Sequence, residues 1–198
     1  EADILGRTDA ELMPEGAAAS CRESDRRAIR EKRIVVTIEP LGDRFYETYK
    51  FPVIIAGEVV GVAGIVRDVT ERKRDKEALE EAEAKYRTIF ENAIMGIFQS
   101  APGGRFISVN PAFARIYGYD SPQEMINTIT DLNKQAYTRP EDRARLLGSL
   151  EKHGVAEKIE IQTYRKDRSI VWASVNARAV KDAKGNLAYY EGTIEDIT

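Results

Sequence analysis

The chain has 198 residues, of which 42% are hydrophobic and 32% are charged. This length and composition fit one or two soluble globular domains, each with an ordinary hydrophobic core, rather than a disordered chain. The 30 Lys and Arg residues nearly balance the 33 Asp and Glu residues, so the formal net charge is only −3. Because no strongly basic face is visible, we expect no nucleic-acid partner.

Cysteine content and hydrophobicity narrow the class further. The single cysteine, Cys21, excludes an intrachain disulfide and a zinc finger. The longest apolar stretch, residues 51–66, is interrupted at Gly57 and Glu58 and is too short to cross a bilayer. No basic region followed by a hydrophobic segment opens the sequence, so we expect no signal peptide. These features predict a cytoplasmic chain without membrane contact of its own.

The first part of the chain predicts a helix followed by strands at residues 34–39, 45–53 and 59–66. Residues 70–92 contain no Gly or Pro and are dense in Glu, Lys, Arg and Ala, which predicts a long helix. Apolar residues recur along it at alternating steps of three and four: Leu79, Ala82, Tyr86 and Ile89. This stripe fits either an amphipathic helix packed on its own domain or the seam of a parallel homodimer.

The second half predicts two strands, several short helices and three more strands. A hairpin is expected over residues 96–100 and 105–109, and Asn110 can cap the next helix with Pro111 at its first position. Another helix opens at Pro140 and ends at His153. The last three strands are predicted at residues 155–165, 170–181 and 187–195.

The strand that begins at Ile170 has two different faces. One face is small and apolar and should meet the helices: Val171, Ala173, Val175, Ala177 and Ala179. Trp172 then lies on the outer face, where we expect another surface to pack against it.

A repeat divides the chain. Residues 61–70 and 190–198 are alike and end in Asp68-Val69-Thr70 and Asp196-Ile197-Thr198. The first copy supplies only the later elements of the second and lacks the opening hairpin.

Motifs throughout the chain resemble the PAS sensor family, as found in histidine kinases and diguanylate cyclases of bacteria and archaea. They occur in family order: residues 86–93, Val109-Asn110-Pro111-Ala112-Phe113, Tyr117-Gly118-Tyr119, residues 139–143, Arg165-Lys166-Asp167, Trp172 and the closing triplets. One departure is Arg168, which stands where the family usually has glycine. A turn without left-handed backbone would tolerate arginine at this position, so we expect this hairpin to have a turn of that less tight kind.

The resemblance implies an α+β PAS fold: a five-stranded antiparallel sheet with helices on one face, in a tandem arrangement. Residues 1–69 would be a partial module, residues 70–92 a connecting signalling helix and residues 93–198 a complete module. The closing triplets would relay a change in the sheet to the outgoing helix through Asp68, Thr70, Asp196 and Thr198. The alternative is that they are ordinary helix-start residues.

The resemblance also implies a small-molecule cavity between the helices and the sheet of the complete module. Candidate lining residues are Phe98, Ile107, Phe113, Ile116, Tyr117, Ile126, Tyr137, Ile159, Ile161, Val175 and Ile194. An empty cavity of ligand size, about 300 Å³, would cost about 7 kcal/mol, comparable to the stability of a whole domain. Such a cavity should therefore be filled by side chains, water or ligand.

Cofactor chemistry and catalysis find little support in the sequence. His153, the only histidine, falls at a helix C-terminus rather than further inside the helix, where haem-binding relatives carry their ligand. Cys21-Arg22 only partly matches the flavin-reactive motif of light-sensing relatives. No Ser/His/Asp set, phosphate-binding loop or Cys/His metal cluster is present. We expect no enzyme activity, metal site or cofactor.

The leading hypothesis is a sensory and signal-relay module whose parent protein carries an output domain, a histidine kinase or a diguanylate cyclase. A homodimer is the expected assembly. The alternative is a ligandless dimerisation or spacer scaffold, and a haem or flavin sensor is less favoured.

Overall fold

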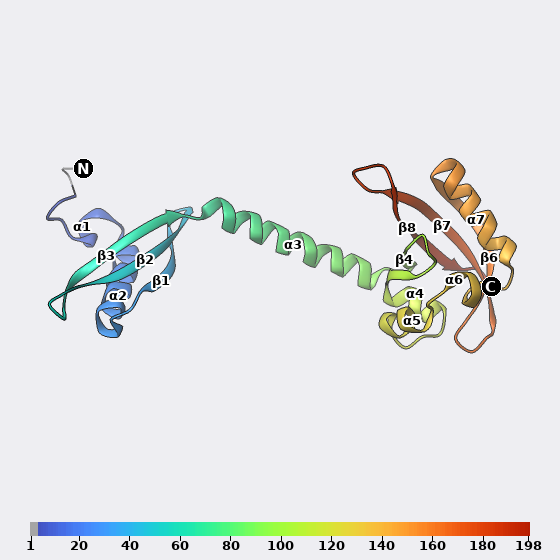
Figure 1. The fold of residues 1–198 in the computed structure, drawn as a ribbon, viewed down its shortest axis with the longest axis horizontal. Helices are drawn as coiled ribbons and strands as arrows, with labels where there is room; N and C mark the ends of the chain where they lie inside the picture. Colours follow the sequence, from blue (N-terminus) through green and yellow to red (C-terminus); the bar gives the residue numbers. More distant parts are fainter. Residues whose placement is uncertain (1–3) are drawn as a thin grey trace. The chain divides into compact units, whose positions relative to one another are not determined.

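A computed structural model describes residues 4–198 of the chain (Figure 1). The chain forms two compact units, one that ends at Ala82 and one that runs from Glu83 to Thr198. We call them the N-terminal unit and the C-terminal unit.

The N-terminal unit is a small antiparallel sheet with helices beside it. Its elements are α1 (Asp9–Leu12), α2 (Glu15–Glu31), β1 (Val35–Leu41), β2 (Arg44–Ile55) and β3 (Glu58–Asp68), with the strands in the order β1-β2-β3. Small side chains such as Ala18 and Ala28 are buried where α2 meets the sheet. Ile38, Ile65 and Val66 remain exposed. This unit therefore buries few large side chains.

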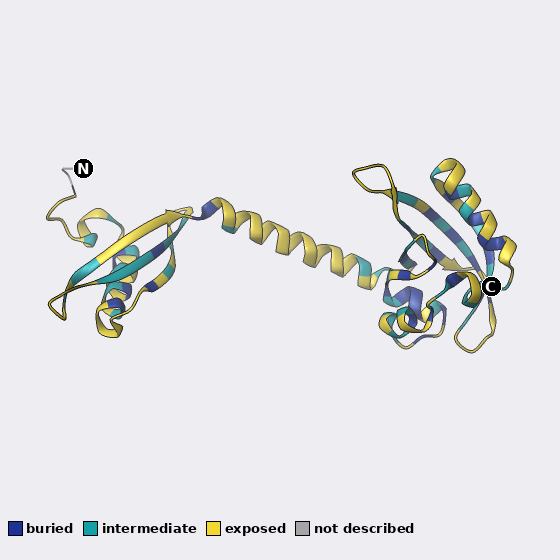
Figure 2. Cartoon of the chain, in the orientation of Figure 1, coloured by how far each residue is buried: buried dark blue, intermediate teal, exposed yellow. Residues whose placement is uncertain are grey.

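Helix α3 spans Thr70–Asn92, which confirms the helix predicted from the absence of Gly and Pro. Its surface is exposed along most of its length (Figure 2). Leu79 is 60% exposed, and Tyr86 and Ile89 are each 62% exposed. Burial of the apolar stripe within the chain is thus not observed among residues 4–198.

The C-terminal unit contains a five-stranded antiparallel sheet. Its strands are β4 (Gly96–Ser100), β5 (Phe106–Val109), β6 (Val155–Tyr164), β7 (Ile170–Lys181) and β8 (Leu187–Asp196), in the order β5-β4-β8-β7-β6. Between β5 and β6 the chain forms α4 (Pro111–Ile116), α5 (Pro122–Thr128), α6 (Leu132–Gln135) and α7 (Pro140–His153). This order confirms the predicted fold class.

One face of this sheet and the helices enclose the core. Val171, Ala173 and Val175 of β7 are buried in one cluster with Leu146 and Leu150 of α7, as the alternating pattern predicts. Trp172, on the other face, is 40% exposed. The buried positions alternate along β7 in Figure 2. The core thus lies between the sheet and α4–α7.

The turn between β6 and β7 corrects one expectation. Arg168 adopts left-handed backbone with φ 68°, so the turn does require the conformation that glycine adopts most easily. The reason is local hydrogen bonding. The Arg168 N–H donates to the Arg165 carbonyl, and the Asp167 carboxylate accepts from the N–H and hydroxyl of Ser169. The Arg168 guanidinium lies 5.4 Å from the Tyr164 ring centroid, which offsets part of the strain.

Candidate functional site

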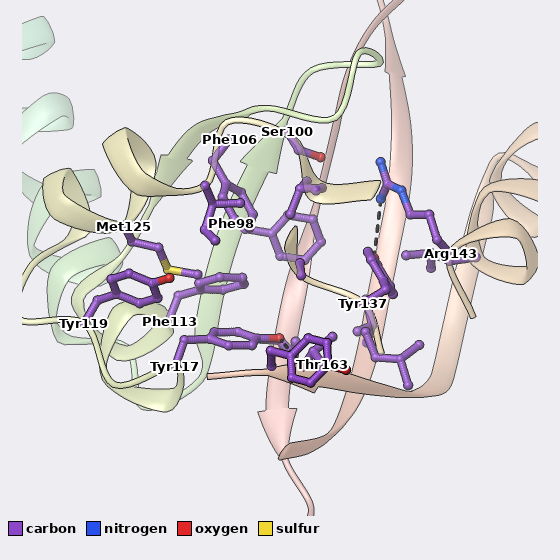
Figure 3. Close-up of a pocket in the computed structure, with 18 residues that line it drawn as sticks. Phe98, Ser100, Phe106, Phe113, Tyr117, Tyr119, Met125, Tyr137, Arg143 and Thr163 are labelled. Atoms are coloured by element: carbon purple, nitrogen blue, oxygen red, sulfur yellow. Dashed lines mark hydrogen bonds between the residues drawn. The ribbon is translucent and has the colours of Figure 1, made fainter. Parts of the chain in front are cut away.

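A cavity of about 40 Å³ lies inside the core of the C-terminal unit, between the inner sheet face and the helices (Figure 3). Every strand of this sheet and all four helices α4–α7 contribute lining residues. They are Phe98, Ser100, Phe106, Phe113, Tyr117, Tyr119, Met125, Ile129, Leu132, Ala136, Tyr137, Arg143, Leu146, Ile161, Thr163, Tyr164, Val175 and Ile194.

Aromatic rings form one side of the cavity. The ring centroid of Phe113, on α4, lies 5.6 Å from that of Phe98 on β4 and 5.2 Å from that of Phe106 on β5. The Tyr117 ring follows at 5.0 Å from Phe113. These distances suit tilted and edge-to-face packing, which holds the rings in fixed positions. This side offers an apolar, preformed wall.

The opposite side of the cavity carries a buried arginine. Arg143, on α7, is 7% exposed; its Nε donates to the Asn133 side-chain oxygen at 3.2 Å, and Nη1 donates to the Tyr137 hydroxyl at 3.4 Å. Its guanidinium carbon is 5.5 Å from the Tyr137 ring centroid. The remaining nitrogen, Nη2, is buried and has no hydrogen-bond partner among residues 4–198. One end of the cavity is therefore positively charged.

Two tyrosine hydroxyls near the cavity stay protonated at neutral pH. Burial raises the pKa of Tyr117, whose hydroxyl also makes a 3.2 Å hydrogen bond with the hydroxyl of Thr163. Burial likewise raises the pKa of Tyr137 above its ordinary value, although the Arg143 charge opposes the shift. Both hydroxyls can therefore donate a hydrogen bond without adding negative charge.

The first closing triplet ties the start of α3 to β2. The Asp68 carboxylate accepts from the Thr70 N–H at 2.9 Å and from its hydroxyl at 2.6 Å. The Val69 N–H donates to the Phe45 carbonyl, and the Phe45 N–H donates to the Thr70 hydroxyl oxygen, each at 2.9 Å. The threonine hydroxyl thus replaces a backbone carbonyl in the ladder just where the chain leaves the sheet.

The second closing triplet repeats this geometry on β7. The Asp196 carboxylate accepts from the Thr198 N–H at 3.0 Å and pairs with Arg165 at 2.7 Å. The Ile197 N–H donates to the Trp172 carbonyl, and the Trp172 N–H donates to the Thr198 hydroxyl oxygen at 3.2 Å. The two triplets are therefore structural as well as sequence repeats.

A groove lies on the outer sheet face of the C-terminal unit. It has a volume of about 500 Å³ and lies between the last turns of α3 and the strands. Tyr86, Ile89 and Phe90 line it from the helix, and residues such as Ile97 and Thr193 line it from the sheet. The exposed side chains of the α3 stripe thus border an open, partly apolar surface.

Comparison with known proteins identifies the fold. A family model described as "PAS domain" matches residues 92–198, and one described as "PAS fold" matches residues 1–74. The chain belongs to the PAS domain family. PAS domains are sensory domains of signalling proteins, which agrees with the relatives found.

Two curated relatives are signalling proteins. The chain is 27% identical over 125 residues to sensor histidine kinase TmoS of Ectopseudomonas mendocina, covering 61% of this chain and 12% of that protein. It is 25% identical over 129 residues to probable diguanylate cyclase DgcE of Escherichia coli K12, covering 63% of this chain and 11% of that protein. The chain thus spans only a small part of the relatives' length.

Solved structures show the same PAS fold. The PAS domain of a Colwellia psychrerythraea protein matches with a TM-score of 0.51 and 21% identity, covering 59% of this chain and 98% of that one. The PAS domain of an HTR-like protein from Haloarcula marismortui gives the same TM-score and identity, covering 63% and 99%. At this identity the likeness concerns the fold alone.

The PAS domain at residues 92–198 places most of the candidate lining residues at the cavity. Those that line it are Phe98, Phe113, Tyr117, Tyr137, Ile161, Val175 and Ile194. Ile116, Ile126 and Ile159 pack against the core without lining the cavity. Ile107 is 51% exposed, which corrects its assignment. It lies on the outer face of β5, because its neighbour Phe106 takes the inward position.

Sequence reasoning missed the polar lining residues. Arg143 belongs to a charged helix start that reads as a solvated surface, and Ser100 and Thr163 lie at strand positions without a clear pattern. One pattern does point to Arg143: it precedes Leu146 and Leu150 by three and seven residues, which places all three on one helix face.

The residues considered for cofactors lie elsewhere. His153 is exposed at the end of α7, and Cys21 is half-buried on α2 in the other unit, 3.7 Å from the Lys50 ammonium. Burial raises the pKa of the Cys21 thiol, although Lys50 opposes this. Among residues 4–198, no helix combines the length and apolar character needed to cross a membrane.

Proposed function

We propose that this chain is the ligand-responsive sensory and relay segment of a larger cytoplasmic signalling protein. Residues 93–198 would form a complete PAS module that binds a small molecule in its core cavity. The observation that carries this proposal is the cavity itself, which combines a fixed aromatic wall with a buried charged end. Cavities with this mixture of apolar lining and a few convergent polar groups are typical ligand sites.

The relay would pass through the closing triplets. Asp196 and Thr198 hold the end of β8 to β7, and Asp68 and Thr70 hold the start of α3 to β2. A ligand that shifts the sheet would change these hydrogen bonds and so bias the outgoing helix. In this proposal residues 1–69 are a partial PAS module and residues 70–92 the connecting signalling helix. The output domain would be a histidine kinase or a diguanylate cyclase.

The proposed assembly is a homodimer formed through α3. The exposed stripe of Leu79, Ala82, Tyr86 and Ile89 needs a partner, and its spacing suits a parallel helix pair. The groove on the outer sheet face would receive part of the same contact. Replacing Leu79 and Ile89 together by Ala tests this. The double variant should sediment with the mass of a monomer, and its melting temperature should no longer depend on protein concentration.

A matched control lies on the opposite side of α3. Replacing Glu81 and Glu91 by Ala should change neither mass nor melting. A monomeric wild-type chain, or a double Leu79 and Ile89 variant that sediments as wild type, would contradict the dimer.

The alternative function is a ligandless scaffold, and the size of the cavity favours it. An empty cavity of about 40 Å³ costs about 1 kcal/mol at roughly 24 cal/mol per Å³, so stability alone does not require an occupant. The ligand proposal therefore depends on the charged end of the cavity.

Mass spectrometry of small molecules released from the native protein separates the two functions. We expect the wild-type chain to carry or bind a compound that the variant Ala136→Leu does not, because this substitution fills the cavity from the residue that follows α6. The control Ala183→Leu, in the exposed turn before β8, should bind as wild type. If no compound is retained and no metabolite raises the melting temperature, the scaffold is the better account.

A further inference from the structure

Arg143 is a buried cation without an anionic partner. No carboxylate lies within 4.0 Å of its guanidinium among the described residues. The adjacent Asp142 carboxylate is already engaged, since it accepts from Arg145 at 3.0 Å and from the Gln162 N–H at 3.2 Å. Arginine is rarely buried unless it is paired, because removing its charge from water is costly. The position of Arg143 therefore calls for an anion.

The hydrogen bonds that Arg143 does make are all to neutral groups. Asn133 and Tyr137 orient two of its nitrogens, and the Tyr137 ring packs beside the guanidinium. These contacts fix the guanidinium at the cavity and leave Nη2 free to donate. The tyrosine hydroxyl beside it stays protonated, since burial raises the pKa of Tyr137. A bound anion would thus meet no negative charge from these groups.

Most of the remaining lining is apolar, and the hydroxyls of Thr163 and Tyr117 bond each other at 3.2 Å. In Figure 3, Phe98, Phe113 and Met125 lie on the side away from Arg143 and Tyr137. A strongly hydrated ion such as phosphate would lose most of its water against these rings without replacement. A ligand with one charged end and a short hydrocarbon tail satisfies both sides.

From this geometry we propose that the cavity binds a short-chain monocarboxylate whose carboxylate pairs with Arg143. The inference rests on the proposed ligand-binding function and names the ligand class. A cavity of about 40 Å³ holds about three to four water-sized groups, which suits only the smallest acids, such as acetate and propionate. The carboxylate accepts from Nη2 and the tail packs against the rings of Phe98 and Phe113.

Titration calorimetry of the 198-residue chain with acetate, propionate and butyrate at pH 7 tests the class. Propionamide and 1-propanol serve as neutral ligands of matched size, and inorganic phosphate as an anion without a tail. We expect propionate to bind at least about tenfold more tightly than propionamide, because a charge-assisted hydrogen bond is lost with the amide. Phosphate should not bind measurably.

Variants then locate the contact. Arg143→Gln should reduce the affinity for propionate to that for propionamide and leave the amide unaffected. Arg115→Gln is the matched control, since it removes the same charge from an exposed position on α4 outside the cavity, and it should bind propionate as wild type. If Arg143→Gln does not fold, the ratio of propionate to propionamide affinity in the wild-type chain still decides the question.

The outcomes distinguish this inference from the proposed function. Equal binding of propionate, propionamide and propanol, or propionate binding unchanged in Arg143→Gln, overturns the monocarboxylate while a ligand site remains. A retained compound of another class overturns it in the same way. If neither the panel nor any retained molecule binds, the ligand-binding function fails together with the inference.

Discussion

The two units place their closing strand differently. In the N-terminal unit, β3 forms an edge of the three-stranded sheet among the described residues, whereas in the C-terminal unit β8 lies between β4 and β7. Both strands nevertheless end in the same hydrogen-bonded triplet. The closure is therefore a local device that needs only the neighbouring strand. The enclosed core and its cavity additionally require the hairpin of β4 and β5 and the helices that follow it.

The largest expected difference concerns two equivalent glycines, Gly64 in β3 and Gly192 in β8. A Cβ at Gly192 would collide with the Asn176 carbonyl oxygen and lie 2.8 Å from the Ala177 Cα, so Gly192→Ala should destabilise the C-terminal unit by about 3 to 4 kcal/mol. A Cβ at Gly64 meets nothing closer than Lys50 Cδ at 3.6 Å, and Gly64→Ala should change stability by less than about 0.5 kcal/mol.

Urea unfolding measures both changes. The fluorescence of Trp172, the only tryptophan, reports on the C-terminal unit, and far-UV circular dichroism reports on the whole chain. Equal effects of the two substitutions would contradict the prediction that Gly192 is much more crowded than Gly64.

The next effect concerns the two ends of α3. Thr70 holds the first turn, and Asn110 holds the last: its side chain accepts from the N–H groups of Ile97 and Phe113 and donates to the carbonyls of Phe90 and Met95. Asn110 is fully buried, so Asn110→Ala leaves these groups unpaired and should cost about 2 to 3 kcal/mol.

The exposed Asn127 provides the control for Asn110. Asn127→Ala should leave the Trp172 unfolding curve within about 0.5 kcal/mol of wild type. A similarly small effect of Asn110→Ala would mean that its four hydrogen bonds do not hold α3 to the core.

A smaller effect separates the two hairpin turns. The β1–β2 turn has Gly42 at φ 63°, whereas the β6–β7 turn has Arg168 at φ 68°. Gly42→Ala should therefore cost about 1 kcal/mol, and Arg168→Gly should stabilise by about 0.5 kcal/mol after the loss of the Tyr164 contact. Arg168→Ala keeps the strain and loses that contact, so it should be slightly destabilising in the same urea experiment. Destabilisation by Arg168→Gly would contradict the strain.

The smallest effect is the pH dependence of the triplets. Hydrogen bonds from Thr198 lower the pKa of Asp196, and hydrogen bonds from Thr70 lower that of Asp68, each from 3.8. A carboxylate with a lowered pKa stabilises the fold above its ordinary pKa, and this contribution is lost as pH falls through the lowered value.

Substitution by Asn isolates this contribution. Asp196→Asn should lower the melting temperature at pH 7 more than Asp68→Asn, since the Arg165 pair is less exposed than the Arg44 pair. Both differences from wild type should shrink below about pH 3. If the differences in melting temperature persist in acid, the effect comes from the changed shape of the side chain and not from the carboxylate charge.

Regular elements were predictable, because long patterns determine them. The alternation of Val171, Ala173 and Val175 gave the inward face of β7, and the absence of Gly and Pro gave α3. Ile107 was misassigned because β5 has only four residues, too few for the sequence to determine which face a residue takes. The Arg168 backbone was missed because side-chain hydrogen bonds in the turn decide it.

The charged end of the cavity was the least predictable feature. Arg143 follows Pro140, Glu141 and Asp142, a sequence typical of an exposed first turn. Its burial depends on how α7 lies over β6 and on the position of Tyr137, which comes from a separate loop. Helical spacing places Arg143 on the face of Leu146 and Leu150, but tertiary packing decides that a charged residue on this face is buried.

The central claim is that the C-terminal unit holds the enclosed core and the N-terminal unit does not. Hydrogen exchange of the full chain tests it most directly through β2 and β7, which each have a partner strand on both sides. After correction for intrinsic rates, the β7 amides should exchange at least about tenfold more slowly than those of β2, a difference of about 1.4 kcal/mol. Equal or greater protection of β2 would contradict the account.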